Sequence, residues 1–149
     1  MTDREMLVEM WTEMWDKYTW IPGWGKSFAD LTPQQAAWKP SQQRNSIWQV
    51  LNHIAFWREV TVDRLAGKGD PKEDVVAKRN FEEPGEVSAS AWKAAQDRLH
   101  RSHEAILKAL NDPKVPVEKL RYLLPHDAYH LGQIMYLRAL QGLPAIGYA

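Results

Sequence analysis

The chain has 149 residues, enough for one domain with a substantial core, and its 19 Lys plus Arg residues balance 19 Asp plus Glu residues, so the formal net charge is zero. This balance argues against nucleic acid as the main partner, because phosphate binding normally needs a basic surface. The absence of cysteine excludes disulfides, cysteine nucleophiles, thiolate zinc sites and iron–sulfur clusters.

The N-terminus and the hydropathy pattern indicate a cytoplasmic protein with no membrane partner. Residues 1–5 are charged and lack the apolar core of a signal peptide. No run approaches the roughly 18 apolar residues of a transmembrane helix. We expect a single domain over residues 1–149. The eight tryptophans are interpreted mainly as bulky core residues, with an aromatic ligand pocket as the alternative.

The first predicted helix spans about residues 3–20. Asp3 is a plausible N-cap, and Pro22 and Gly23 follow the C-terminal end. An apolar stripe at helical spacing supports this helix and consists of Leu7, Trp11, Met14 and Tyr18.

A loop to about residue 45 follows, interrupted by one short helix over 32–38. There, Thr32 begins a capping box that has proline in the first helical position. The second long helix spans about 46–66, with Ser46 as N-cap. His53 lies on a stripe of this helix that is otherwise mostly apolar.

The connection over 67–87 is long for a helix bundle, where roughly 2–8 residues suffice. It can return along the roughly 30 Å of the preceding helix, so the helix at 46–66 and the next one, at 88–110 with Ser88 as N-cap, can run parallel. The last helix is predicted over about 117–141. Pro125 either kinks it or marks its first turn, and we favour the kink. The pattern predicts an all-α, bundle-like fold of four long helices.

His126 and His130 lie four residues apart, on one face of the last predicted helix. Two imidazoles so placed can bind one metal ion, and His53 is the best candidate for a third ligand. The alternative is a set of buried neutral histidines that hydrogen-bond to backbone carbonyls and tyrosine hydroxyls.

Other catalytic motifs are missing or incomplete. A zinc protease needs Glu directly after the first histidine, whereas Asp127 follows His126. No phosphate-binding glycine-rich loop and no Gly-x-Ser-x-Gly elbow is present. His100 is expected to face solvent. His103 is ambiguous: an exposed or hydrogen-bonded ring is favoured, but the ring could be buried and could approach a metal.

Three segments carry a resemblance to a known family, namely residues 31–40, 46–57 and 126–134. The second contains Asn52-His53-Ile54-Ala55-Phe56-Trp57, and the third contains His126-Asp127-Ala128-Tyr129-His130-Leu131-Gly132-Gln133. In these segments, and in their order and spacing, the chain resembles the DinB-like superfamily (DNA-damage-inducible proteins and their relatives).

The resemblance implies a four-helix bundle with up-down-down-up topology and a long crossover between its second and third helices. It also implies a divalent metal, often nickel or zinc, held by His53, His126 and His130. Family members are often homodimers. Relatives include S-transferases that use bacillithiol or mycothiol, and many members have no assigned reaction.

Three histidine ligands with an open coordination position are typical of catalytic rather than structural metal sites. The leading hypothesis is a transferase that joins a low-molecular-weight thiol to a small-molecule substrate. A metal-dependent hydrolase and a stress-associated metal-binding protein without turnover stay open. We expect Asp127 or Gln133 to orient a ligand ring or a water, Trp57 to wall a pocket or pack in the core, and Gly132 to permit close helix packing.

Overall fold

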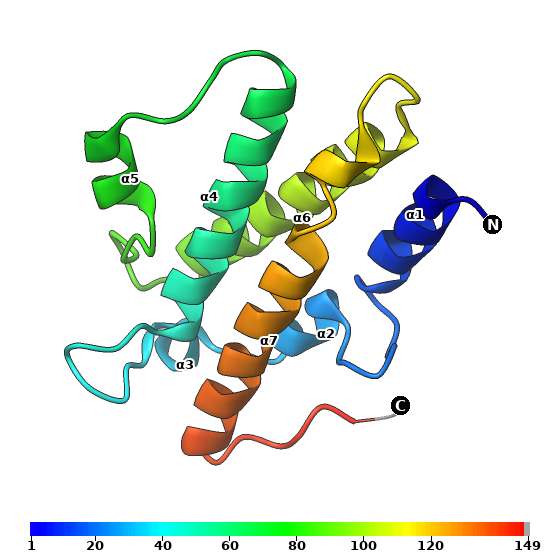
Figure 1. Ribbon diagram of the computed structural model, residues 1–149. Helices are drawn as coiled ribbons and strands as arrows, with labels where there is room; N and C mark the ends of the chain where they lie inside the picture. The colour runs from blue at the N-terminus through cyan, green and yellow to red at the C-terminus, as the bar shows by residue number, and fades with distance from the viewer. Residues whose placement is uncertain (148–149) are drawn as a thin grey trace.

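The computed structural model describes residues 1–147 and is all-helical there, with no strand in that range, which confirms the predicted all-α class. Figure 1 shows α4 and α7 side by side, α6 crossing behind them, and α5 on the outer side of α4. None of the helices in residues 1–147 is long and apolar enough to cross a membrane. The helices are α1 (Asp3–Glu13), α2 (Trp24–Ala29), α3 (Pro33–Ala37), α4 (Ile47–Leu65), α5 (Glu73–Arg79), α6 (Ala89–Asn111) and α7 (Leu123–Leu140).

Helix α4 lies at the centre of the molecule and packs against α6, α7, α3 and α5. Its N-terminus is set locally: the Ser46 hydroxyl accepts the Gln49 N–H over 3.1 Å, and the Gln49 side chain accepts the Ser46 N–H over 3.0 Å. All residues from Ile47 to Phe56 are buried, as expected of a helix covered on most of its faces. A polar side chain in this stretch, such as that of His53, therefore points into protein.

Tryptophans supply much of the core, as the favoured interpretation of their number predicts. Trp11 donates its indole N–H to the carbonyl of His103 over 3.0 Å, and Trp92 donates to the carbonyl of Leu31 over 3.2 Å. Such partners satisfy the N–H groups of these two rings, whereas the buried indole N–H of Trp24 has no partner among the described residues. The buried tryptophans are Trp11, Trp24, Trp48 and Trp92.

The first helix is shorter than predicted. Thr2, not Asp3, is its N-cap, and the helix ends at Glu13 rather than near Trp20. After it the chain folds back, so that the N–H of Trp24 bonds to the carbonyl of Met14 over 3.0 Å. The apolar spacing continues past the end of the helix, where Met14 is buried and Tyr18 is half-buried. The segment after the turn forms α2, which the sequence did not predict.

The predicted start of α4, the capping box of α3 and the Ser88 N-cap of α6 are all confirmed. Within the connection 67–87 the chain forms α5, which was not predicted. The favoured kink at Pro125 is wrong. Helix α7 begins at Leu123 after a 3-10 turn over Val117–Lys119, so Pro125 occupies the first helical turn, where its missing N–H costs no helix bond.

Candidate metal centre

Three imidazoles meet between α4 and α7. His53 comes from the middle of α4, and His126 and His130 come from successive turns of α7. One ring nitrogen of each lies within 4.8 Å of the others, and the Nε2 atoms of His53 and His126 are 3.2 Å apart. The packing of α4 against α7 thus brings together the three predicted ligands, 73 residues apart in sequence between His53 and His126.

Each of these rings has its other nitrogen held by an oxygen. His53 Nδ1 lies 2.5 Å from Asn80 Oδ1, His126 Nδ1 lies 2.9 Å from Asp127 Oδ1, and His130 Nδ1 lies 2.7 Å from Gln133 Oε1. A carboxylate accepts hydrogen bonds only, and Asn80 Oδ1 also accepts the Trp57 indole N–H over 3.1 Å. The Nδ1 atoms are therefore the donors, and the Nε2 atoms carry the lone pairs.

Lone pairs that face each other 3.2 Å apart repel unless a cation lies between them. The separation matches that of two nitrogens bound tetrahedrally to one ion at about 2.0–2.1 Å, which is about 3.3 Å. Burial lowers the pKa of His53 to about 4 and also lowers the pKa of His130 below its usual value. These rings are neutral at pH 7, so they are in the protonation state that a metal requires.

The site has one side open to solvent. The side chains of His53 and His130 are buried, whereas that of His126 is 34% exposed. Among residues 1–147 no further His, Asp or Glu joins the group of three. Three protein ligands leave at least one coordination position for a water or a substrate atom, which is the arrangement of catalytic rather than structural sites.

His53 is oriented by Asn80, which lies in the connection between α5 and α6 and was not predicted as a site residue. Helix α4 clamps this connection: Gln49 donates to the carbonyl of Phe81 over 3.1 Å, and Asn52 donates to the carbonyl of Glu82 over 2.8 Å. Phe81 has a φ of 51°, unusual for a bulky residue, and its ring stacks on that of His53 with centroids 3.9 Å apart. Asn80 and Phe81 thus fix the position of one ligand.

Asp127, which accepts the hydrogen bond from His126, also forms a buried ion pair with Arg58. Asp127 and Arg58 are both fully buried. Arg58 Nε donates to Asp127 Oδ2 over 2.9 Å, and its Nη2 lies 2.8 Å from the same oxygen. The guanidinium also lies over the rings of Trp11 and Trp24, at 4.7 and 5.4 Å from their centroids. Asp127 therefore links His126 of α7 to Arg58 of α4.

Four further residues were singled out in the sequence: Gln133, Trp57, His103 and Gly132. Gln133 holds His130, as stated, and Trp57 donates to Asn80. His103 is buried and stacked on Trp11 at 5.2 Å, outside the three-histidine group, so it does not approach the candidate metal position. The expected packing role of Gly132 is wrong, because a Cβ added there would meet no atom within 4 Å.

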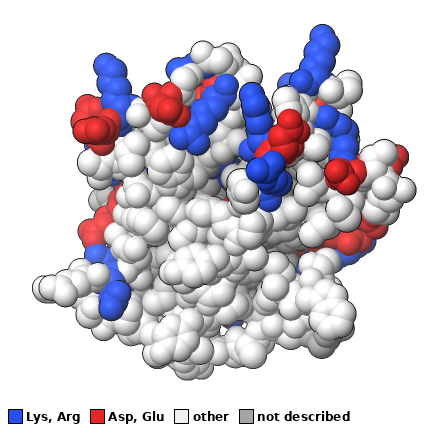
Figure 2. All heavy atoms as spheres, viewed as in Figure 1, with Lys and Arg blue, Asp and Glu red and all other residues white. Residues whose placement is uncertain are grey.

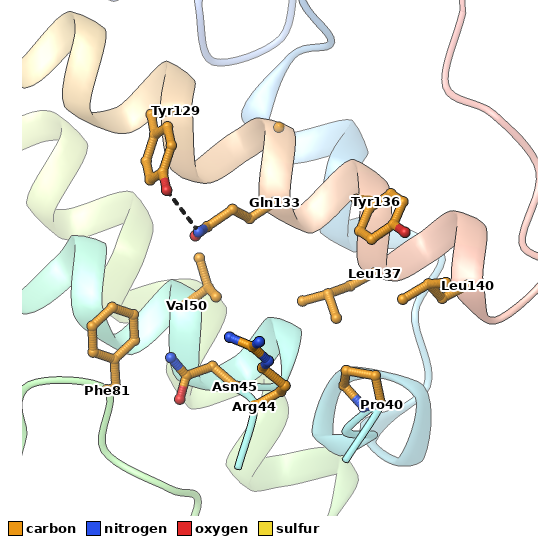
Figure 3. A pocket seen from close by; sticks show the side chains of 11 residues that line it. Pro40, Arg44, Asn45, Val50, Phe81, Tyr129, Gln133, Tyr136, Leu137 and Leu140 are labelled. Atoms are coloured by element: carbon orange, nitrogen blue, oxygen red, sulfur yellow. Dashed lines mark hydrogen bonds between the residues drawn. The ribbon is translucent and has the colours of Figure 1, made fainter. Parts of the chain in front are cut away.

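A cavity of about 680 Å³ lies between α4 and α7 (Figure 3). Two of the residues around the imidazoles also line it: Phe81, which stacks on His53, and Gln133, which holds His130. Within residues 1–147, no tryptophan is among its lining residues, so the aromatic part of its wall consists of Phe81, Tyr129 and Tyr136.

Comparison with known proteins places the chain in a family. A family model described as the DinB superfamily matches residues 24–134, which include all three histidines and the residues that hold them. The chain belongs to the DinB superfamily. No curated protein and no solved structure matches this DinB-superfamily chain, so the features of its site come from its own residues.

Proposed function

We propose that this DinB-superfamily protein binds a divalent metal ion through Nε2 of His53, His126 and His130 and acts as a metal-dependent transferase that uses a low-molecular-weight thiol. The observation that carries the proposal is the convergence of three imidazoles whose Nδ1 atoms are all engaged by oxygens. Nickel or zinc is the expected metal, because imidazole suits both ions.

When bound, the ion supplies Lewis acidity that lowers the pKa of a ligand in its open position. The protein contributes three neutral ligands, so the centre keeps its full positive charge and favours an anionic sulfur. In the transfer, the thiol proton passes to solvent, the sulfur forms a bond to an electrophilic carbon, and the leaving group departs with the electron pair of the broken bond. The exposed side of His126 supports access to the centre.

Two other functions remain as alternatives: a metal-dependent hydrolase, and a stress-associated metal-binding protein without turnover. The open position supports either enzyme over the third possibility, since a protein that only stores metal needs no such position. The thiol reaction and the hydrolysis differ in what they consume, and an assay of metal-loaded protein separates them.

The metal is tested by elemental analysis of purified protein. We expect about one nickel or zinc ion per chain for the wild type and less than about a tenth of that for a His126→Ala, His130→Ala double variant. His100→Ala is the matched control, because His100 is an exposed histidine of α6 outside the group of three. Equal metal in the double variant and the wild type would overturn the assignment.

The reaction is tested with zinc- or nickel-loaded protein, bacillithiol and monochlorobimane. Transfer forms a carbon–sulfur bond, releases chloride and produces a fluorescent adduct. We expect the rate above background to disappear in the double variant. A loaded protein that leaves the background rate unchanged with bacillithiol and mycothiol, and instead hydrolyses ester or amide substrates, would favour the hydrolase.

We also propose the finer features that the family resemblance implies. The up-down-down-up arrangement of α1, α4, α6 and α7 is supported by Figure 1, where α4 and α6 run in the same general direction and α1 and α7 in the opposite one. A homodimer in the cytoplasm is the expected state. Sedimentation at micromolar concentration tests it, and a sharp monomer mass would contradict it.

A further inference from the structure

The cavity beside the metal centre has one charged residue in its wall. Arg44 is the one residue of a charged type among its lining residues, and the rest are apolar, aromatic or amide side chains and one glycine. No carboxylate lies within 4 Å of the Arg44 guanidinium among the described residues. This arginine is therefore available to an anion from outside the chain.

The position of Arg44 directs its charge into the cavity. Figure 3 shows its guanidinium pointing into the space between α4 and α7, toward Gln133 and beside Asn45. Arg44 and Asn45 immediately precede Ser46, the N-cap of α4, so the positive end of the helix dipole adds to the charge of the guanidinium. Arginine offers a planar set of donors that fits a carboxylate or a phosphate.

Apolar side chains form another part of the cavity wall. Val50 of α4 and Leu137 and Leu140 of α7 line it. Figure 2 shows that charged side chains gather over the upper part of this face of the molecule and that the lower part, over the C-terminal half of α7, is nearly free of them. The volume of about 680 Å³ is in the range of sites for small organic ligands.

We propose that this cavity binds a small amphiphilic anion, with its carboxylate or phosphate on Arg44 and its apolar part against Val50, Leu137 and Leu140. Phe81 and Gln133 connect the cavity to the imidazoles, so such a molecule lies next to the metal centre. That this ligand is a substrate of the metal centre rests on the proposed function, whereas its binding at Arg44 does not.

The test compares two fluorescent probes of similar aromatic structure on protein freed of metal with EDTA. One is the anion 1-anilinonaphthalene-8-sulfonate, and the other is neutral N-phenyl-1-naphthylamine. For Arg44→Gln we expect about a tenfold weaker binding of the anion, because the variant loses a hydrogen bond between charged groups. Binding of the neutral probe should stay within about twofold and also shows that the cavity has kept its shape.

Arg121→Gln is the matched control. Arg121 is an exposed arginine just before α7, it has no carboxylate partner among the described residues, and it does not line the cavity. It should leave the binding of both probes unchanged. Displacement of the anionic probe by octanoate, octyl phosphate and 1-octanol then identifies the oxyanion, and both anions should compete better than the alcohol.

Four results would overturn the proposal: no binding of either probe to the wild type, equal losses for both probes in Arg44→Gln, no loss for the anion, or the same loss in Arg121→Gln. The outcome is separate from that of the metal test. Loss of the probe contrast with normal metal content would reject only the anion site, and a normal contrast in a protein that binds no metal would reject only the metal centre.

Discussion

The buried pair of Asp127 and Arg58 offers the sharpest test of how the centre is held. Both carboxylate oxygens are engaged: Oδ1 accepts from His126 Nδ1 over 2.9 Å, and Oδ2 accepts from Arg58 Nε over 2.9 Å. An Asp127→Asn substitution keeps the shape but leaves one oxygen and adds an NH₂ donor. That donor must face either the imidazole N–H or the guanidinium, both of which are also donors.

Two losses of different kind are expected from Asp127→Asn. The free energy of unfolding should fall by about 3–5 kcal/mol, because the positive charge of Arg58 stays buried without its counter-charge. Zinc affinity should fall about 10–100-fold, since the residue that orients a ligand ring and fixes its tautomer typically contributes that much. Denaturation in urea with EDTA measures the first loss, and competition with a chromophoric chelator measures the second.

The chain contains a second Arg–Asp pair that serves as control. Arg138 of α7 is buried, and its Nη1 and Nη2 each lie 2.7 Å from an oxygen of Asp30, whose pKa is lowered mainly by these hydrogen bonds. Asp30 is half-exposed, so water can replace its carboxylate. Asp30→Asn should cost less stability, about 1–2 kcal/mol, and leave zinc affinity unchanged. A folded Asp127→Asn protein with zinc affinity within twofold of the wild type would refute the reasoning.

Three further predictions concern single sites. Burial, together with the nearby charge of Arg58, lowers the pKa of His103 to about 3. Below pH 6.5 the unfolded chain therefore takes up a proton at His103 that the folded chain does not, so the free energy of unfolding falls as the pH falls. Between pH 7.5 and 5 the free energy of unfolding, measured by urea denaturation, should therefore fall by about 2 kcal/mol more for the wild type than for His103→Gln, at about 1.36 kcal/mol per pH unit below pH 6.5. Parallel plots of unfolding free energy against pH for the two proteins would contradict this. Asn80→Ala removes the oxygen that accepts the His53 Nδ1–H and should weaken zinc binding about tenfold in the chelator assay. Asn80→Asp keeps an oxygen at this position and should bind zinc as the wild type does. Equal zinc affinities for the wild type and both variants would show that this acceptor is unimportant. Gly132→Ala should stabilise the protein by about 0.5–1 kcal/mol, because the added Cβ meets nothing within 4 Å. Gly23→Ala should destabilise it by about 1–3 kcal/mol, because the added Cβ would lie 2.9 Å from the backbone of Asp16. Urea midpoints that shift in the same direction for both variants would contradict this pair of expectations.

Helix starts were the part of the fold most accessible from sequence. Thr32, Ser46 and Ser88 were all identified as N-caps, and the structure has each of them in that role. A cap depends on residues within one turn of the helix, so its signal is contained in a few neighbouring positions. For the same reason the capping box at α4 predicts where His53 lies in its helix.

Helix ends and short helices were less accessible because distant contacts decide them. The end of α1 at Glu13 depends on the chain turning back, with the N–H of Gly25 bonded to the carbonyl of Trp15 over 2.8 Å. Gly23 lies against the backbone of Asp16, an approach that no local pattern indicates. The apolar periodicity extends through Tyr18, but only Leu7 and Trp11 lie in α1, and Met14 is buried after the helix has ended.

The site shows the same division between local and distant information. In α7 each ligand is followed closely by the residue that holds it, Asp127 after His126 and Gln133 after His130, and both were named from sequence. The holder of His53 is Asn80, which lies 27 residues away in a connection without periodicity. Nothing in the sequence around Asn80 distinguishes it from other loop residues.

The imidazoles of α7 and the imidazole of α4 are positioned by different parts of the chain. The α7 half has its two imidazoles and the residues that hold them within eight residues of one helix. The α4 half depends on the connection 80–82, which is fixed by hydrogen bonds from Gln49 and Asn52 and by the stacked ring of Phe81. Because Phe81 and Gln133 also line the cavity, a ligand bound there contacts one holding residue from each half. A ligand in the cavity should therefore contact Phe81 and Gln133, the side chains that also orient His53 and His130.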